Sequence, residues 1–173
     1  NPNSPYSASK ASADHLVRSY NITFGLNTTI SNCSNNFGLN QNIEKFIPKI
    51  IHSIINNKTI PVYGDGKNIR DWIYVIDHCR AIDLIYNNAN SGERYNIGGE
   101  NEISNIELIK LIYQIFSAEK DYDISFINDR HGHDRRYSIS NKKIYKDLNF
   151  KLKYKFKNSL ANLINEIKDN YEF

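Results

Sequence analysis

The sequence predicts an α/β fold, because segments with a helical period alternate along the chain with short β-branched segments. The clearest helix is a continuous apolar stripe at the helical period: Ile43, Phe46, Ile47, Ile50, Ile51, Ile54 and Ile55. The chain has 173 residues, of which 40% are hydrophobic and 24% charged. This composition is typical of a globular domain with a real core.

The first predicted helix covers residues 5–24. Ser4 offers a hydroxyl to cap it, Pro5 suits the first helical position, and Gly25 ends it. The next elements are expected in this order: a strand at 26–33, a polar loop at 34–38, the apolar helix at 43–55, and strands at 59–63 and 68–75.

The second half of the chain continues the alternation. Asp77 is expected to cap a helix whose inner face is His78, Ala81, Ile82 and Ile85. Ser104 and Glu107 form a capping box before another helix. The remaining predictions are strands at 95–97 and 124–127, helices near 141–147 and 158–170, and an edge strand at 151–157, where lysines alternate with apolar residues.

Bulk properties exclude several classes of protein. No apolar run is long enough to span a bilayer, and no signal peptide is recognisable, so we expect no membrane partner. Cys33 and Cys79 belong to no pairing motif and are expected to be reduced and buried, which suits the cytoplasm. The net charge of +3 does not indicate any particular class of binding partner. The basic tract at 142–157 lacks the aromatic pattern of known RNA-binding modules, so we expect no nucleic-acid partner.

Tyr6 and Lys10 are the candidate catalytic pair. They stand four residues apart, so they share one face of the first helix. The positive end of the helix and the ammonium group both favour the phenolate form, which suits a general base. On its own this short pattern is more often a half-buried aromatic beside a surface lysine.

Four polar clusters lie in loops or at element ends, and they are Asn35-Asn36, Pro61-Val62-Tyr63 with Arg70, Asn105, and Arg130 with His133. Each cluster alone is more often structural, because loop asparagines make turns and neighbouring arginine and aspartate residues pair. Arg70 and Arg130 offer planar forks that suit a diphosphate. Asparagines suit sugar hydroxyls or the edge of a uracil or thymine, and Tyr63 suits stacking on a base. His131 and His133 lack nearby cysteines and a carboxylate cluster, so we expect no metal. None of the eight glycines builds the glycine-rich turn that cradles a dinucleotide phosphate.

Taken in order, the motifs resemble one family. Tyr6-Ser-Ala-Ser-Lys10 resembles the active-site helix of extended short-chain dehydrogenases. The later motifs resemble the dTDP-glucose 4,6-dehydratases, and they are Cys33-Ser-Asn-Asn-Phe-Gly38, Glu44-Lys-Phe-Ile-Pro48, Pro61-Val-Tyr-Gly-Asp-Gly66, Ile69-Arg-Asp-Trp-Ile-Tyr-Val75, Asn96-Ile-Gly-Gly99 and Asp129-Arg-His-Gly-His-Asp-Arg-Arg-Tyr137. The resemblance runs from Ser4 to about residue 163. It implies the C-terminal part of an extended Rossmann-type short-chain dehydrogenase with its smaller substrate-binding domain.

The resemblance also implies a mechanism. Tyr6 would take the proton from the C4 hydroxyl of glucose while NAD accepts hydride from C4, and Lys10 would hold the nicotinamide ribose. Water is then lost across C5 and C6, and the hydride returns to C6 to give a 4-keto-6-deoxy sugar nucleotide. Asn36 would contact the cofactor. The implied substrate-binding residues are Asn35, Lys45, Phe46, Pro61, Val62, Tyr63, Arg70, Asn105, Arg130 and His133.

The resemblance further implies how the chain is divided and assembled. Residues 1–38 would end the NAD-binding domain, and residues 39–173 would mostly bind the sugar nucleotide, with 69–100 returning to the Rossmann sheet. The chain starts Asn1-Pro2-Asn3 and contains no Met, so we expect a C-terminal piece of a longer homodimeric enzyme. The glycine-rich turn and the acid pair for the elimination would lie upstream, and this chain alone is expected to be inactive.

Two alternatives stay open from the sequence. UDP-glucose could replace dTDP-glucose, because uracil and thymine differ by one methyl group, worth only about 1–3 kcal/mol in a pocket. The chain could instead be a sugar-nucleotide-binding piece without catalytic activity.

Overall fold

The computed structural model describes residues 2–116 and 123–170, and it confirms the α/β class. The helices are α1 (Pro5–Phe24), α2 (Phe46–Ile55), α3 (Val75–Asn88), α4 (Asn105–Phe116), α5 (Lys142–Leu148) and α6 (Phe156–Asn170). The strands are β1 (Ile30–Cys33), β2 (Asn35–Phe37), β3 (Ile60–Tyr63), β4 (Ile69–Tyr74), β5 (Arg94–Ile97), β6 (Glu102–Ser104), β7 (Ile124–Ile127) and β8 (Arg136–Tyr137).

The strands form three small sheets. β1 and β5 pair in parallel, and so do β3 and β7. In the largest sheet β4 is central: β2 and β8 pair with it in parallel and β6 pairs antiparallel. β2 lies within the segment predicted as a loop, and the short strands β6 and β8 were not predicted. Asn35 and its neighbours are held as a strand by pairing with β4, which local sequence does not reveal.

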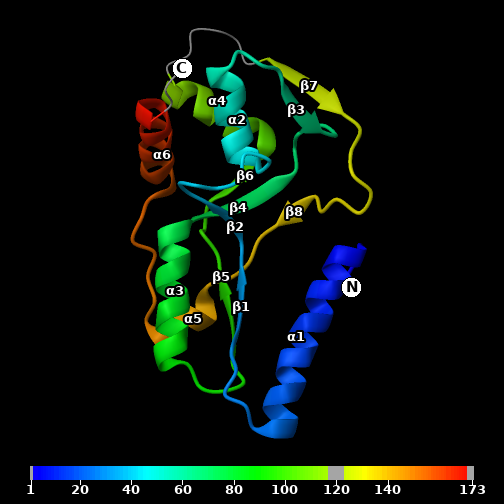
Figure 1. Cartoon of the computed structure of the whole chain (residues 1–173), viewed down its shortest axis with the longest axis vertical. Helices are drawn as coiled ribbons and strands as arrows, with labels where there is room; N and C mark the ends of the chain where they lie inside the picture. The colour runs from blue at the N-terminus through cyan, green and yellow to red at the C-terminus, as the bar shows by residue number, and fades with distance from the viewer. Residues whose placement is uncertain (1, 117–122, 171–173) are drawn as a thin grey trace.

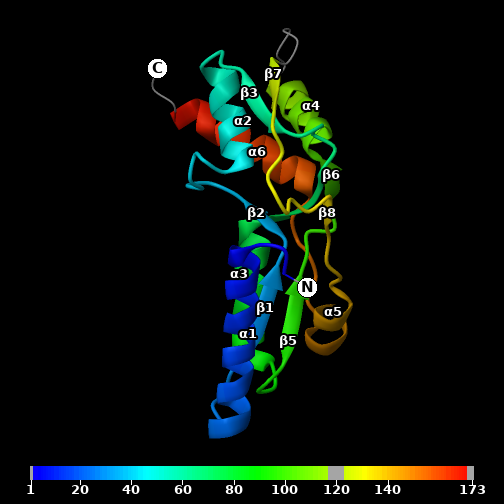
Figure 2. The ribbon, with the colours of Figure 1, turned by 90° about the vertical axis from the view of Figure 1, so that its right-hand side faces the viewer.

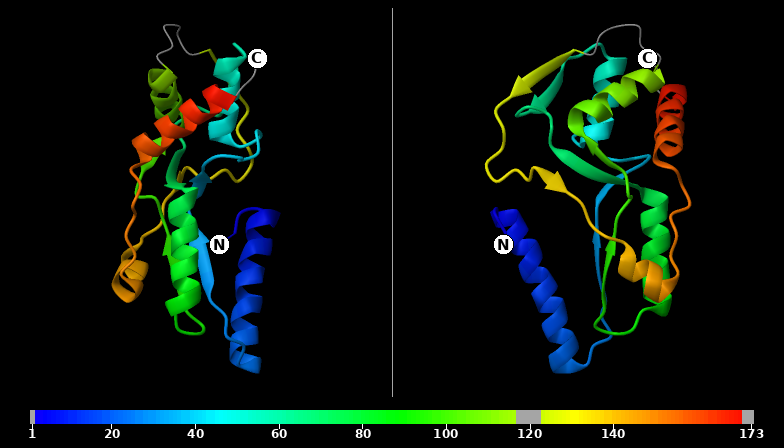
Figure 3. Two further views of the ribbon diagram at one scale, coloured as in Figure 1. Left: turned by 60° about the vertical axis from the view of Figure 1, so that its left-hand side comes forward. Right: turned by 180° about the vertical axis from the view of Figure 1, so that it is seen from behind.

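Two apolar clusters hold the elements together. Figure 2 shows α2, α4 and α6 packed at one end of the molecule, where their buried faces share a core with β3 and Trp72 of β4. The second cluster joins α3 and α5 to β5 at the other end. Figures 1 and 3 show α1 on one side of β1 and β5 and α3 on the other side.

Helix α1 follows its predicted bounds. The Ser4 hydroxyl accepts the Ser7 amide at 3.1 Å, and Gly25 ends the helix with φ +66°. No side chain of α1 is buried, and its link to β5 is an ion pair of 3.4 Å between Asp14 and Arg94. The first helix therefore presents its residues to the surface along its whole length.

Asp77 was expected to cap a helix, and this prediction is wrong. It lies inside α3, is only 1% exposed, and its carboxylate accepts the backbone amides of Lys153 and Tyr154 at 3.0–3.1 Å. Because those amides are used, residues 151–155 of the predicted edge strand at 151–157 are irregular, and residues 156–157 begin α6. The buried face of α3 is Asp77, Ala81 and Ile85, so the prediction for Ile82, which is exposed, was also wrong.

The cysteines and helix lengths bear on the remaining bulk predictions. Cys33 is half-buried, but Cys79 is exposed, so the prediction of two buried thiols was wrong for Cys79. Among residues 2–116 and 123–170, no helix is long and apolar enough to cross a membrane.

Gly99 sits where β4 and the segment after β5 come closest. The carboxylate of buried Asp71 accepts the amides of Gly99 at 2.8 Å and Asn101 at 2.6 Å. A Cβ atom on Gly99 would lie 1.8 Å from the carbonyl oxygen of Trp72. The close approach of two backbones therefore explains the glycine at this position.

We expect Gly99→Ala to lower the free energy of unfolding by about 1–3 kcal/mol, because the backbone beside Trp72 must shift to admit a methyl group. Chemical denaturation measures the change. Gly25→Ala is the matched control, since open space surrounds a Cβ atom there and only its positive φ opposes the substitution. Equal stability of Gly99→Ala and the parent chain would contradict the steric explanation.

Candidate functional site

The candidate site is a cavity of about 340 Å³ between β2, β3, β4, the start of α2, the start of α4 and the loop after β7. Nine of the ten predicted substrate-binding residues line it: Asn35, Lys45, Phe46, Pro61, Tyr63, Arg70, Asn105, Arg130 and His133. The tenth, Val62, is 1% exposed and belongs to the apolar core. The structure therefore brings together residues that lie up to 98 positions apart, from Asn35 to His133.

Strand geometry selects which residues reach this cavity. Successive side chains of a strand point to opposite faces. On β3, Pro61 and Tyr63 line the cavity, while Ile60 and Val62 are buried in the core. On β4, Arg70 and Trp72 line the cavity, and Asn35 of β2 is paired directly with Trp72.

Helix starts supply two further walls. Lys45 directly precedes α2, and Lys49 follows four residues later on the same face. Asn105 is the first residue of α4 and directly follows Ser104 of the predicted capping box. In this box the Glu107 carboxylate accepts the Ser104 amide at 3.1 Å, and the Ser104 hydroxyl accepts the Glu107 amide at 3.3 Å. The helix starts therefore direct their cation and amide side chains to one cavity.

A four-residue cluster forms the outer wall. The Nδ1 atom of His133 donates to the Asp129 carboxylate at 2.6 Å, and its Nε2 atom accepts from the Arg130 guanidinium at 3.0 Å. The bond from His133 lowers the pKa of Asp129. The Arg130 guanidinium also lies over the Tyr63 ring, 5.0 Å from its centroid. Arg130 is therefore oriented before any ligand arrives.

Arg70 is held by the backbone. Its Nη1 atom donates to the Ile69 carbonyl at 2.7 Å and its Nη2 atom to the Asp134 carbonyl at 2.8 Å. Burial lowers the pKa of this guanidinium, although arginine stays protonated at any physiological pH. Together with Lys45, Lys49 and Arg130, it gives the cavity four cationic side chains against one carboxylate, Glu44. Such a cavity suits an anion rich in oxygen atoms.

Tyr6 and Lys10 lie outside the cavity, on α1. The Tyr6 side chain is 74% exposed. Burial raises the pKa of Tyr137, and the nearby Cys33, Asp134 and Tyr6 raise it further against the opposing effect of Arg70. Tyr137 of β8 is thus within electrostatic reach of both Tyr6 and Arg70.

Asn36, predicted on the cofactor side, is also outside the cavity. Its Oδ1 atom accepts from His78 Nδ1 at 2.9 Å, and its amide nitrogen donates to Cys33 Sγ at 3.2 Å. Burial lowers the pKa of His78, which favours the neutral ring that donates from Nδ1. Asn36 is therefore held in one orientation by β1 and α3.

Three residues of the cavity were not predicted: Glu44, Lys49 and Trp72. Helical spacing from Lys45 and strand alternation from Arg70 were signals for Lys49 and Trp72. Trp72 is 4% exposed, and its indole N–H has no partner among the described residues. No group of three potential metal ligands occurs in the described part of the chain.

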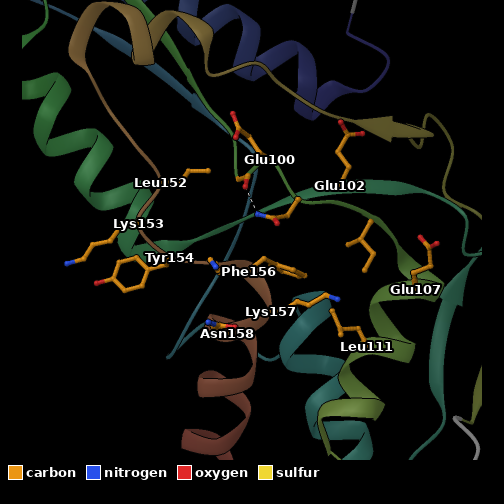
Figure 4. A pocket seen from close by; sticks show the side chains of 14 residues that line it. Glu100, Glu102, Glu107, Leu111, Leu152, Lys153, Tyr154, Phe156, Lys157 and Asn158 are labelled. Atoms are coloured by element: carbon orange, nitrogen blue, oxygen red, sulfur yellow. Dashed lines mark hydrogen bonds between the residues drawn. The ribbon is translucent and has the colours of Figure 1, made fainter.

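A larger cavity of about 860 Å³ lies beside β6 and the start of α6. Figure 4 shows Glu100, Glu102 and Glu107 on one wall and Lys153 and Lys157 on the segment opposite. Glu102 and Glu107 are already bonded to Arg136 and Ser104. Its three glutamates and three lysines give no preference for one charge, and none of the predicted site residues lines it.

Comparisons with known proteins agree on one family. The family model described as GDP-mannose 4,6 dehydratase matches residues 1–163. A dTDP-glucose 4,6-dehydratase from Escherichia coli is 46% identical over 169 residues, which is 94% of this chain and 47% of the relative. The chain thus spans about half the length of the curated relatives it matches.

Two solved structures are similar throughout the chain. DesIV, a dTDP-glucose 4,6-dehydratase from Streptomyces venezuelae solved with NAD and TYD bound, has a TM-score of 0.94 at 39% identity, over 98% of this chain and 52% of that one. A dTDP-glucose 4,6-dehydratase from Bacillus anthracis in complex with NAD has a TM-score of 0.92 at 41% identity, over 98% and 54%.

Proposed function

The chain belongs to the GDP-mannose 4,6 dehydratase family, and from this we propose that it carries the nucleotide-sugar site and the catalytic tyrosine of a dTDP-glucose 4,6-dehydratase. The observation that carries the proposal is the single cavity lined by nine residues that the family resemblance implies as substrate-binding. Its relatives of that activity are 42–46% identical over most of the chain, which supports the same substrate.

The cavity would bind the nucleoside diphosphate. Arg70 of β4 and Arg130 of the loop after β7 would offer guanidinium donors to the two phosphates, and Lys49 of α2 lines the same cavity. Tyr63, whose ring already contacts Arg130, would stack on the base. Asn35 would hydrogen-bond the sugar. The substrate is thereby fixed by its nucleotide, which leaves the hexose to extend toward Tyr137 and Tyr6.

Tyr6 would remove the proton from the C4 hydroxyl of the sugar. It is placed in the first turn of α1, at the positive end of the helix dipole. Lys10, one turn further, adds a positive charge on the same face. The two residues thus act together, one as the proton acceptor and the other as its electrostatic support.

The residues present fit one end of NAD. Tyr6 and Lys10 are both exposed and share a helix face, so a phenol and an ammonium group are open to a ribose. Asn36 is held by its hydrogen bond with His78 at 2.9 Å. We propose that these three residues contact the cofactor. When bound there, NAD would supply an acceptor for the hydride of the sugar and a donor for its return.

The proposal is tested by assaying the native gene product with dTDP-glucose and UDP-glucose in competition. We expect a 4-keto-6-deoxy product, with dTDP-glucose preferred by about 10–200-fold if the cavity encloses the thymine methyl group. A preference for UDP-glucose would transfer the proposal to that nucleotide. No 4-keto product from either sugar would contradict it.

We also propose a homodimer formed through α1. Its exposed side chains include Leu16, Tyr20 and Phe24, and the last two rings contact each other in a tilted arrangement with centroids 5.3 Å apart. An apolar stripe of this kind is typical of an interaction surface. Sedimentation of the native protein and of Leu16→Glu tests it. A cytoplasmic location and the lack of a nucleic-acid partner stay predictions from the sequence.

A further inference from the structure

We propose that Arg135 and Arg136 are positioning residues that fix the loop 128–135 so that it presents Arg130 and His133 to the nucleotide. This inference rests on the function proposed above. Neither arginine lines the cavity, although both lie in the same motif as the two residues that do. Each forms a two-point contact with a carboxylate on a different element.

The internal contacts of the loop do not attach it to the rest of the molecule. His133 bonds to Asp129 and Arg130, and Gly132 has a φ of +69°, which lets the loop turn tightly. These contacts set Arg130 and His133 relative to each other. Within the cavity the pair also contacts the Tyr63 ring, and β8 pairs with β4 from Arg136 onward. Outside the cavity, the contacts of Arg135 and Arg136 with carboxylates add side-chain attachments on either side of this pairing.

Arg135 attaches the loop to the strand that carries Tyr63. Its Nη1 and Nη2 atoms donate to the Asp65 carboxylate at 2.7 and 3.1 Å. Asp65 lies in the turn that follows β3, where it also accepts the Lys67 amide at 2.9 Å. The contact from Arg135 lowers the pKa of Asp65 to about 2, so the carboxylate stays charged.

Arg136 attaches the end of the loop to β6. Its Nε and Nη2 atoms donate to Glu102 at 2.6 and 2.8 Å, and the Ser138 hydroxyl donates to the same carboxylate at 2.7 Å. Figure 4 shows Glu102 pointing toward β8. Glu102 is paired across the sheet with Asp71, next to Arg70. The second attachment is thus made to the sheet that carries Arg70.

The backbone between these attachments positions a third cation. The Asp134 carbonyl accepts from Arg70 Nη2 at 2.8 Å and from the buried Asn68 amide at 3.2 Å. A displaced loop would therefore release Arg70 as well as moving Arg130 and His133. The side chains of Arg135 and Arg136 are more than half exposed, and exposed ion pairs contribute little to overall stability. Their effect is expected on the site and not on unfolding.

The test is a double-mutant cycle with Asp65→Asn, Arg135→Gln and the double variant. The first readout is the Kd for dTDP. Binding is monitored by the fluorescence of Trp72, which is the only tryptophan of the sequence and lines the cavity. We expect each single variant to weaken binding about two- to fivefold. The double variant should bind no more weakly than either single, because Arg135 acts through Asp65. The melting temperature should stay unchanged. Arg94→Gln, which breaks the remote pair with Asp14, is the matched control.

The second readout is amide hydrogen exchange over residues 128–138 without ligand. We expect faster exchange in Arg135→Gln and Arg136→Gln than in the parent chain. Unchanged exchange in these variants would overturn the proposal, and so would additive losses of dTDP affinity in the cycle. Failure of the parent chain to bind dTDP would instead contradict the proposed function, and the exchange measurement would still decide whether the two arginines order the loop.

Discussion

Tyr6→Phe is expected to lower the turnover of dTDP-glucose by about 10²–10⁴-fold, the range typical of removing a general acid or base. The substitution deletes only the phenolic oxygen at the start of α1, where the side chain is exposed and packs into no core. Folding should therefore be unaffected. The measurement is steady-state kinetics of the native gene product, with the 4-keto product detected directly.

The control for Tyr6 lies on α3. Tyr86→Phe removes the same oxygen atom from a side chain that is 85% exposed, and it should leave turnover unchanged. Because Tyr6 does not line the cavity, dTDP affinity should be equal in both variants and the parent. Turnover by Tyr6→Phe within twofold of the parent would remove Tyr6 from the mechanism.

Arg70→Ala is expected to weaken dTDP binding by about 100-fold, since hydrogen bonds to charged groups contribute about 1.5–3 kcal/mol. The guanidinium lines the cavity and also holds the Asp134 carbonyl of the loop that carries Arg130. Its removal therefore deletes one phosphate ligand and loosens another. Calorimetric titration of the chain with dTDP measures the loss.

Arg70→Lys provides a graded comparison. It keeps the charge but loses the planar fork that bonds two acceptors at once, so an intermediate affinity is expected. Equal binding by Arg70→Ala and the parent chain, with both folded, would exclude Arg70 from the nucleotide site.

The local structure was predictable wherever one residue pattern decided it. Helix α1 begins after Ser4 and ends before Gly25, as their residue types indicate. Strand β3 has two faces, one with Pro61 and Tyr63 and one with buried Ile60 and Val62. The motifs at strand and helix ends placed nine residues in one cavity, although Val62 turned inward instead. Their roles toward a ligand stay predictions.

The errors at Asp77 and Asn35 share a physical cause, which is pairing between distant segments. Asp77 looked like a helix cap, but its carboxylate binds the amides of Lys153 and Tyr154, 76 and 77 residues away. That one interaction also explains why the alternating lysine segment is not a strand. Asn35 looked like a loop residue, yet the ladder with Trp72 makes it part of β2. The place of Trp72 in the cavity follows from strand alternation only once it is known that Arg70, two residues earlier, lines the cavity.

The central claim is that this cavity binds the nucleoside diphosphate of a sugar nucleotide. Calorimetric titration of the 173-residue chain with dTDP and, separately, with thymidine tests it most directly. Four cationic side chains line the cavity, so we predict one dTDP bound per chain and affinity for thymidine at least about 100-fold lower, because thymidine lacks the phosphates. Equal affinities for the two compounds, or no binding of dTDP, would contradict the claim.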